Sequence, residues 1–238
     1  MHASLRNALL ALVALLIAAA ASAQTAPDLS GVWRLDGGFT QELKTIDGNV
    51  PPLLPQAQML YRKRQAQYKA GDRSFDRASM ICVSPGMPRM VLLPYPFQII
   101  QSQKQMAFLF EWNGRHRLID LSGAVLDPPD LFYMGTAAGH VEGDTMVIET
   151  EGLVDTSLLD ASGMPHSDQL RLTERYRLAD GGKALINEMT IDDPQIFSQP
   201  WKTRATYKRM PRGTEIQEDV CRERMSKGGP AFQLDKWK

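Results

Sequence analysis

The chain has 238 residues, and its 27 basic side chains balance its 27 acidic side chains. Neither charge gathers into a stripe, so the sequence disfavours binding to nucleic acid or to an anionic membrane surface. It has no Gly-x-Ser-x-Gly elbow, no Walker loop and no dinucleotide fingerprint, which disfavours serine hydrolysis and nucleotide chemistry. We therefore expect no cofactor, and no feature implies a protein partner.

The first 23 residues have the pattern of a secretion signal. Arg6 precedes an unbroken apolar run over 8–21, and residues 21–23 form a small-residue cleavage site. The run is too short to span a bilayer, which needs about 20 apolar residues. We predict a signal peptide over 1–23 and one domain over 24–238 with no membrane span. The expected location is periplasmic or secreted.

The two cysteines, Cys82 and Cys221, fit a disulfide better than a catalytic or metal-binding role. Neither lies in a CxxC pair or in a His-flanked metal spacing. An even pair of cysteines in an exported protein is typically oxidised. We predict that this disulfide ties the C-terminal tail to the rest of the domain, with a stabilisation of roughly 4 kcal/mol.

The predicted elements begin with one helix and continue as strands. Pro55 suits a first helical turn, and residues 56–70 contain no Gly, Pro or β-branched residue before Gly71. Its weakly apolar face predicts an accessory helix on the barrel surface or across one mouth. From 89 to 210, apolar residues mostly recur with period two, which is typical of strands.

Short strands joined by tight turns predict an all-β fold, an antiparallel meander that closes into a barrel. One face of the strand over 170–178 is apolar, whereas its other face is polar. The clearest strands are 106–112, 145–149 and 170–178, and the expected hairpin turns are Asn113-Gly114, 142–144 and 180–182.

Residues 27–33 read Pro-Asp-Leu-Ser-Gly-Val-Trp, directly after the leader. The Gly31-X-Trp33 spacing resembles the lipocalin signature, in which the Trp closes one end of a barrel. That resemblance implies an arginine from a late strand over the Trp33 ring, with Arg175 and Arg204 as candidates.

Further motifs extend this resemblance over nearly the whole mature chain. The chain resembles a group of secreted, mostly uncharacterised bacterial proteins that begin with PDLSGVW, and this implies a lipocalin-like (calycin-type) barrel. Many members have His and Trp where this chain has Thr136 and Val141, so a functional His there would be lost or altered here. The shared motifs lie at 82–89, 139–145, 165–168, 190–194 and 200–201.

Three histidines, His116, His140 and His166, remain after the leader. Three histidines can in principle bind zinc. If Gly143 centres a hairpin, His140 lies near the turn, and His166 enters the next strand about 16 Å away. A shared metal would need a long loop to fold back, so we predict no metal site.

His166 is also the candidate general acid–base. It follows a long loop over 152–165, and such loops form lids or mouths on barrels. A His oriented by a carboxylate can transfer protons at neutral pH, and Glu149 and Asp168 are the nearby candidates. The alternative is that His166 caps the loop through hydrogen bonds to the backbone.

Glu174 shares the apolar face of its strand and is predicted to point into the barrel. A buried carboxylate must be paired or protonated, and the candidate partners are Arg115, Arg117 and Tyr133. Two interpretations stay open: a pocket carboxylate with a raised pKa that donates a proton, or a structural ion pair.

The predicted function is to hold a small apolar or aromatic molecule in the barrel mouth. The alternative is a cofactor-independent lyase or isomerase, with His166, Glu149, Asp168 and Glu174 as its catalytic residues. An enzyme should place His166 against a carboxylate in a polar cavity, whereas a carrier should have an apolar cavity with His166 outside it. The candidate ligand-binding residues are Phe108, Phe110, Trp112, Tyr133 and Tyr176.

Overall fold

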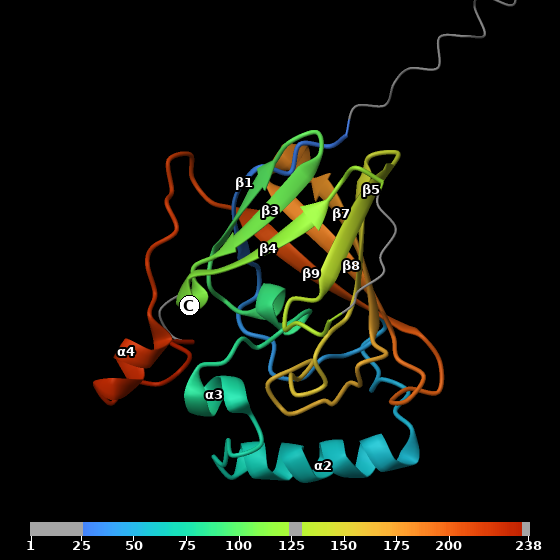
Figure 1. Ribbon diagram of the computed structural model, residues 1–238, viewed down its shortest axis with the longest axis vertical. Coiled ribbons are helices and arrows are strands. Elements are labelled where there is room, and N and C mark those ends of the chain that lie inside the picture. Colours follow the sequence, from blue (N-terminus) through green and yellow to red (C-terminus); the bar gives the residue numbers. More distant parts are fainter. Residues whose placement is uncertain (1–25, 124–129, 235–238) are drawn as a thin grey trace, which may run out of the picture.

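A computed structural model describes residues 26–123 and 130–234 and shows a closed nine-stranded barrel (Figure 1). The strands follow chain order around the barrel, and β1 closes it by pairing with both β2 and β9. The predicted leader over 1–23 lies outside the described residues. The strands are β1 Gly31–Leu35, β2 Phe97–Gln101, β3 Gln105–Phe110, β4 Arg115–Asp120, β5 Thr136–Glu142, β6 Thr145–Glu151, β7 Arg171–Ala179, β8 Ala184–Asp192 and β9 Trp201–Arg209.

The predicted all-β barrel with an accessory helix is confirmed. The accessory helix starts at Pro55, which needs no backbone N–H in the first turn. Two further helices are short, and one lies between α2 and β2 whereas the other follows β9. The helices are α2 Pro55–Lys69, α3 Arg77–Ile81 and α4 Cys221–Ser226, with short 3-10 turns at Arg89–Leu92, Trp112–Gly114 and Asp180–Gly182.

The barrel departs from a pure antiparallel meander at one junction. Every neighbouring pair of strands is antiparallel except β4 and β5, which run parallel. Asp120↔Ala138 is the one residue pair that joins these two strands, whereas β3–β4 has six pairs and β5–β6 has seven. The prediction of antiparallel pairing was wrong here, because β5 runs in the same direction as β4.

Side-chain alternation was predicted correctly for β7. Leu172, Glu174 and Tyr176 are buried inside the barrel, and Arg171 and Arg177 are exposed on the outer face. Successive side chains of a strand point to opposite faces, so one apolar face is enough to fix which residues enter the core.

The hairpin turns were predicted with unequal success. Gly143 and Asp144 form a two-residue turn between the paired residues Glu142 and Thr145, as expected. The turn at Asn113 is longer than predicted, because β3 ends at Phe110 and four residues connect it to β4. Asn113 has a φ of 54°, a left-handed conformation that Asn tolerates better than most residues.

Loops cover one end of the barrel, and α2 lies across them on the far side (Figure 1). The buried Asp160 joins these layers. It accepts hydrogen bonds from the Tyr61 hydroxyl at 2.7 Å and from the backbone N–H groups of Leu43 and Met164, each at 3.0 Å. The helix therefore packs on the loops that close the mouth rather than on the barrel wall.

The segment over 82–89 is buried almost throughout. Gly86 has a φ of 77°, and a Cβ atom there would lie 2.6 Å from the Ser157 hydroxyl, so the backbone approach requires glycine. Arg89 ends the segment with two hydrogen bonds to Asp76, of 2.9 and 2.7 Å. Asp76 also accepts from the Ala78 N–H at the start of α3.

Trp33 is fully buried, and its indole N–H donates to the Leu29 carbonyl at 2.9 Å. The guanidinium that packs over its ring belongs to Arg209, 4.1 Å from the ring centroid. Arg175 and Arg204, the predicted candidates, instead pair with glutamates on the outer surface. The prediction failed because β9 brings Arg209, not Arg204, opposite Trp33.

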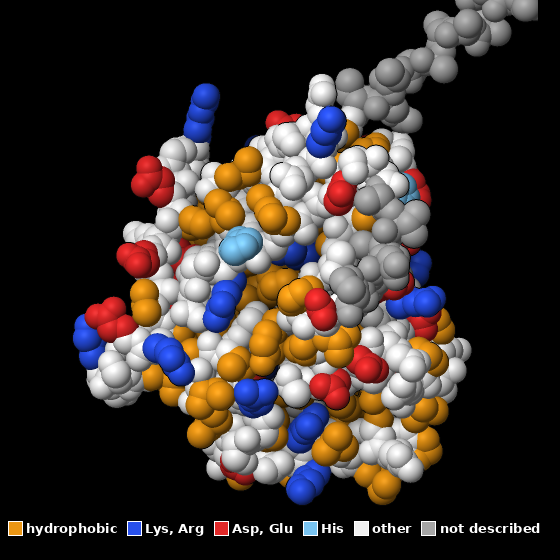
Figure 2. Space-filling model, viewed as in Figure 1, with side chains coloured by type: hydrophobic (Ala, Val, Ile, Leu, Met, Phe, Trp, Pro, Cys, Tyr) orange, Lys and Arg blue, Asp and Glu red, His pale blue; other side chains and the backbone are white. Residues whose placement is uncertain are grey.

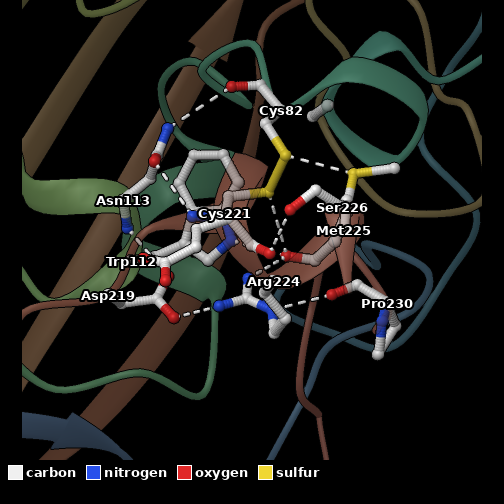
Figure 3. The surroundings of a disulfide bond; sticks show 12 residues. Cys82, Trp112, Asn113, Asp219, Cys221, Arg224, Met225, Ser226 and Pro230 are labelled. Carbon is white, nitrogen blue, oxygen red and sulfur yellow. Dashed lines mark hydrogen bonds and ion pairs between the residues drawn. A yellow bond between two sulfur atoms is a disulfide. The ribbon is translucent and has the colours of Figure 1, made fainter. Parts of the chain in front are cut away.

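The predicted disulfide between Cys82 and Cys221 is confirmed, with a Cα–Cα separation of 5.9 Å (Figure 3). It joins the end of α3 to the start of α4 in the C-terminal tail. Arg224 holds the tail together, because its guanidinium pairs with Asp219 and donates to the Pro230 carbonyl. The tail is thereby fastened to the rest of the domain, as expected.

Candidate functional site

A cleft of about 730 Å³ opens in the barrel wall beside the β4–β5 junction. Residues 114–118 and Asp120 line it on the β4 side, and residues 132–137 line it on the β5 side, together with Ser84 and Gln105. The opening follows from the topology, because β4 and β5 share the single pair Asp120↔Ala138. We refer to this feature as the β4–β5 cleft.

Two large apolar side chains are exposed in the β4–β5 cleft. Leu118 is 56% exposed and Phe132 is 52% exposed, and Tyr133 and Met134 beside them are half-buried. Figure 2 looks onto β3, β4 and β5 and shows hydrophobic side chains gathered at the centre of this face. Contiguous exposed apolar surface is a mark of a binding site in soluble proteins.

Arg117 enters the barrel interior from the same stretch of β4. Its guanidinium lies 2.6 Å from the Glu174 carboxylate and donates to the Thr150 hydroxyl at 2.5 Å. Both charged groups are buried, and the attraction between them offsets part of the free energy that each loses on leaving water. Of the three candidate partners predicted for Glu174, Arg117 is the one that the structure shows.

The other polar neighbours of Glu174 are hydrogen-bond donors. Tyr176 donates its hydroxyl to this carboxylate at 2.8 Å, and the Asn187 amide donates to it at 3.3 Å. Burial, and next the charge of Glu174, raises the pKa of the Tyr176 hydroxyl, which keeps that hydroxyl protonated. The two charges are therefore matched inside the barrel, which favours the structural interpretation of Glu174, while Nε and Nη1 of Arg117 have no hydrogen-bond partner among the described residues.

The five predicted ligand-binding aromatics do not share one cavity. Phe108, Phe110 and Tyr176 pack together in the core, with ring centroids 5.6 Å apart for Phe108–Tyr176 and 6.2 Å apart for Phe108–Phe110. Trp112 lies under the C-terminal tail, where its N–H donates to the Ala231 carbonyl. Tyr133 alone among the five lines the β4–β5 cleft.

His166 is 4% exposed and lies outside the β4–β5 cleft. Its Nε2 atom is 2.8 Å from the Ser157 hydroxyl, and its Nδ1 atom is 2.9 Å from the Ser167 carbonyl oxygen. Because the carbonyl can only accept, Nδ1 carries a proton; the Ser157 hydroxyl also donates to the Val154 carbonyl at 3.1 Å. Burial lowers the pKa of this imidazole.

The two carboxylates predicted to orient His166, Glu149 and Asp168, form no hydrogen bond with it among the described residues. Both side chains are exposed. The ordering carboxylate is Asp193, which accepts from the N–H and the hydroxyl of Ser167 at 2.6 and 2.8 Å. Its place in the sequence, before Pro194, marked a turn but not this long-range contact.

The other two histidines, and the two positions at which this chain differs from the similar secreted proteins, form no hydrogen bond with His166 in the described part of the chain. His116 and Thr136 line the β4–β5 cleft, and His140 pairs with Glu142 on the surface at 3.0 Å. Val141 is partly buried against the core. Within residues 26–123 and 130–234, no three His, Cys, Asp or Glu side chains gather in a metal-binding group.

Comparisons with known protein families and with curated proteins found no match to this chain. None of the helices in the described ranges combines the length and the apolar character that a membrane crossing needs. The inference about function therefore depends on the geometry of the β4–β5 cleft.

Proposed function

We propose that the protein binds a small, largely apolar or aromatic molecule in the β4–β5 cleft. One observation carries the proposal: Leu118 and Phe132 are more than half exposed on opposite sides of a cleft of about 730 Å³. A ligand that covers both side chains removes apolar surface from water, which contributes roughly 25 cal/mol per Å². The volume lies within the range of about 300–1,000 Å³ that is typical of small-molecule sites.

The position of His166 also favours binding over acid–base catalysis. The imidazole is buried outside the cleft and is hydrogen-bonded to a hydroxyl and a carbonyl, not to a carboxylate. Its contacts resemble those of a residue that stabilises the loop before β7. A lyase or isomerase role for His166, Glu149, Asp168 and Glu174 stays a prediction that no contact supports.

An extracytoplasmic location belongs to the same proposal. The apolar leader over 1–23 supports export, and a disulfide is typical of proteins in oxidising compartments. A periplasmic or secreted protein that holds an apolar molecule would shield it from water outside the cytoplasm.

Native mass spectrometry of the protein purified from the compartment of its own host tests the proposal. We expect a retained organic molecule that is lost in Phe132→Ser and kept in Leu60→Ser. Leu60 is a matched control, because it is an exposed apolar side chain on α2, away from the cleft. His166→Gln should keep the molecule as well.

A titration with the uncharged aromatic probe N-phenylnaphthylamine covers the case in which no molecule survives purification. Probe fluorescence should rise with the wild-type protein and with Leu60→Ser, and much less with Phe132→Ser. If Phe132→Ser binds the probe or retains the molecule as well as the wild type does, the cleft is not the site and the proposal is wrong.

A further inference from the structure

Arg115 is a cation without a partner in an otherwise largely apolar cleft. It lies at the start of β4, on the same face as Arg117, and is half-buried. Its Nε atom is buried and has no hydrogen-bond partner. In the described ranges, no carboxylate lies within ion-pairing distance of its guanidinium, and no ring or hydroxyl bonds it.

The other two charged residues discussed on β4, Arg117 and Asp120, do not neutralise Arg115. The positive charge of Arg117 is matched by Glu174 at 2.6 Å. Among the described residues that line the cleft, Asp120 is the one carboxylate, and it lies five residues further along β4, about 16 Å away. Its carboxylate already accepts a hydrogen bond from the Ser122 N–H at 2.6 Å. The cleft therefore retains one uncompensated positive charge beside its apolar surface.

An unpaired, partly desolvated guanidinium is costly, because buried N–H donors that lose water need another acceptor. Arginine is also the side chain best suited to bind a carboxylate, since its planar donors match the two oxygens. Phe132 and Met134 on the β5 side provide the complementary apolar surface, whereas Leu118 lies on the face of β4 opposite to Arg115. One free charge matches one singly charged anionic group.

We propose that the ligand of the β4–β5 cleft is a small organic acid, whose carboxylate binds the Arg115 guanidinium while its apolar part covers Phe132 and Met134. This inference rests on the proposed function and narrows it from apolar molecules in general to apolar monocarboxylates. Arg117 does not provide the anchor, because its charge is already matched inside the barrel.

The test uses two pairs of probes that differ only in charge: cinnamate with cinnamamide, and octanoate with octanamide. Affinities are measured by calorimetry at neutral pH for the wild type, Arg115→Gln and Arg177→Gln. Arg177 is the matched control, because it is an exposed arginine on the outer face of β7. The wild type should prefer each acid over its amide by about tenfold to hundredfold, as expected for a charged hydrogen bond.

Arg115→Gln should lose most of this preference while it binds the amides as the wild type does, and Arg177→Gln should keep it. Equal affinities for acid and amide, or an unchanged preference in Arg115→Gln, would overturn the carboxylate inference and leave apolar binding intact. If Phe132→Ser and the wild type bind none of the four probes, the proposed function and this inference both fail.

Discussion

The barrel interior and the β4–β5 cleft both contain arginine and phenylalanine side chains, which differ between the two regions in their ion pairing and exposure. In the interior, Arg117 is paired with Glu174, and the rings of Phe97 and Phe108 stack with centroids 5.7 Å apart. In the cleft, Arg115 has no partner among the described residues, and Phe132 is half exposed.

Both arginines belong to β4 and lie two residues apart on the same face, so local sequence does not explain this difference. The difference comes from what the fold places opposite each one: β6 and β7 side chains face Arg117, and the opening beside β5 faces Arg115. The charge of Arg117 is matched within the fold, whereas among the described residues that of Arg115 is not.

The largest expected effect is in the interior. Glu174→Leu should lower the free energy of unfolding by about 3–5 kcal/mol, because it leaves Arg117 buried without a counter-charge. Urea denaturation at neutral pH measures this change. The double variant Arg117→Met/Glu174→Leu should regain much of the loss, since both buried charges are then absent.

An exposed ion pair provides the control for this experiment. Glu188 and Arg204 are 2.7 Å apart on the outer surface of β8 and β9. Glu188→Leu should cost less than about 1 kcal/mol, because water screens the pair. Similar costs for Glu188→Leu and Glu174→Leu would contradict the view that the interior depends on its ion pair.

A smaller loss should follow from removal of the disulfide. Cys82→Ala/Cys221→Ala should lower the free energy of unfolding by about 2–4 kcal/mol, because the bond closes a loop of 139 residues in the unfolded chain. Ser84, two residues after Cys82, lines the cleft. We therefore expect the variant to bind the apolar probe more weakly while the circular dichroism of the strands is retained. Unchanged stability on urea denaturation would show that the tail is held by other contacts.

The interior could be predicted from the sequence much better than the cleft. Period-two alternation placed Glu174 inside and limited its partners to a few residues, of which Arg117 is the one observed. Alternation reports only which face a residue occupies. It does not report which distant strands pair, so the parallel β4–β5 junction and the position of Arg209 over Trp33 were missed.

The same limit explains the individual site residues. Arg115 was considered only as a partner for Glu174, because no local pattern shows that a strand edge lies beside an opening. His166 was correctly placed near a loop, but its contacts with Ser157 and Ser167 depend on how that loop folds. A half-exposed Phe132 has no sequence signal that separates it from the core phenylalanines.

A modest effect on the pH dependence of stability should distinguish His166 from the residues of the cleft. Burial lowers the pKa of His166 in the folded state. The unfolded chain therefore binds this proton first as the pH falls below about 6.5, and stability falls with it. The contribution is at most about 1.4 kcal/mol per pH unit.

Urea denaturation between pH 7.5 and 5.5 measures this slope, with His166→Gln as the test and the exposed His140→Gln as the control. The slope should be shallower in His166→Gln and unchanged in His140→Gln. Affinity for the uncharged probe should be equal in both variants, because neither side chain lines the cleft. An equally steep slope in His166→Gln would assign the pH dependence to other groups.

The smallest expected effect is on the stability of Arg115→Met, and it sharpens the comparison most directly. Arg115 makes no ion pair in the described part of the chain, so its removal leaves no counter-charge unpaired. Methionine keeps the length of the side chain and removes a buried N–H group that has no partner. We expect the free energy of unfolding to change by less than about 0.5 kcal/mol, or to increase.

Arg117→Met, measured in parallel by urea denaturation, should instead be strongly destabilising, because it leaves the Glu174 carboxylate buried without a counter-charge. Two identical substitutions two residues apart on one strand would then differ by several kcal/mol. A large loss in Arg115→Met would mean that Arg115 supports the fold, and its lack of a partner would no longer point to a ligand.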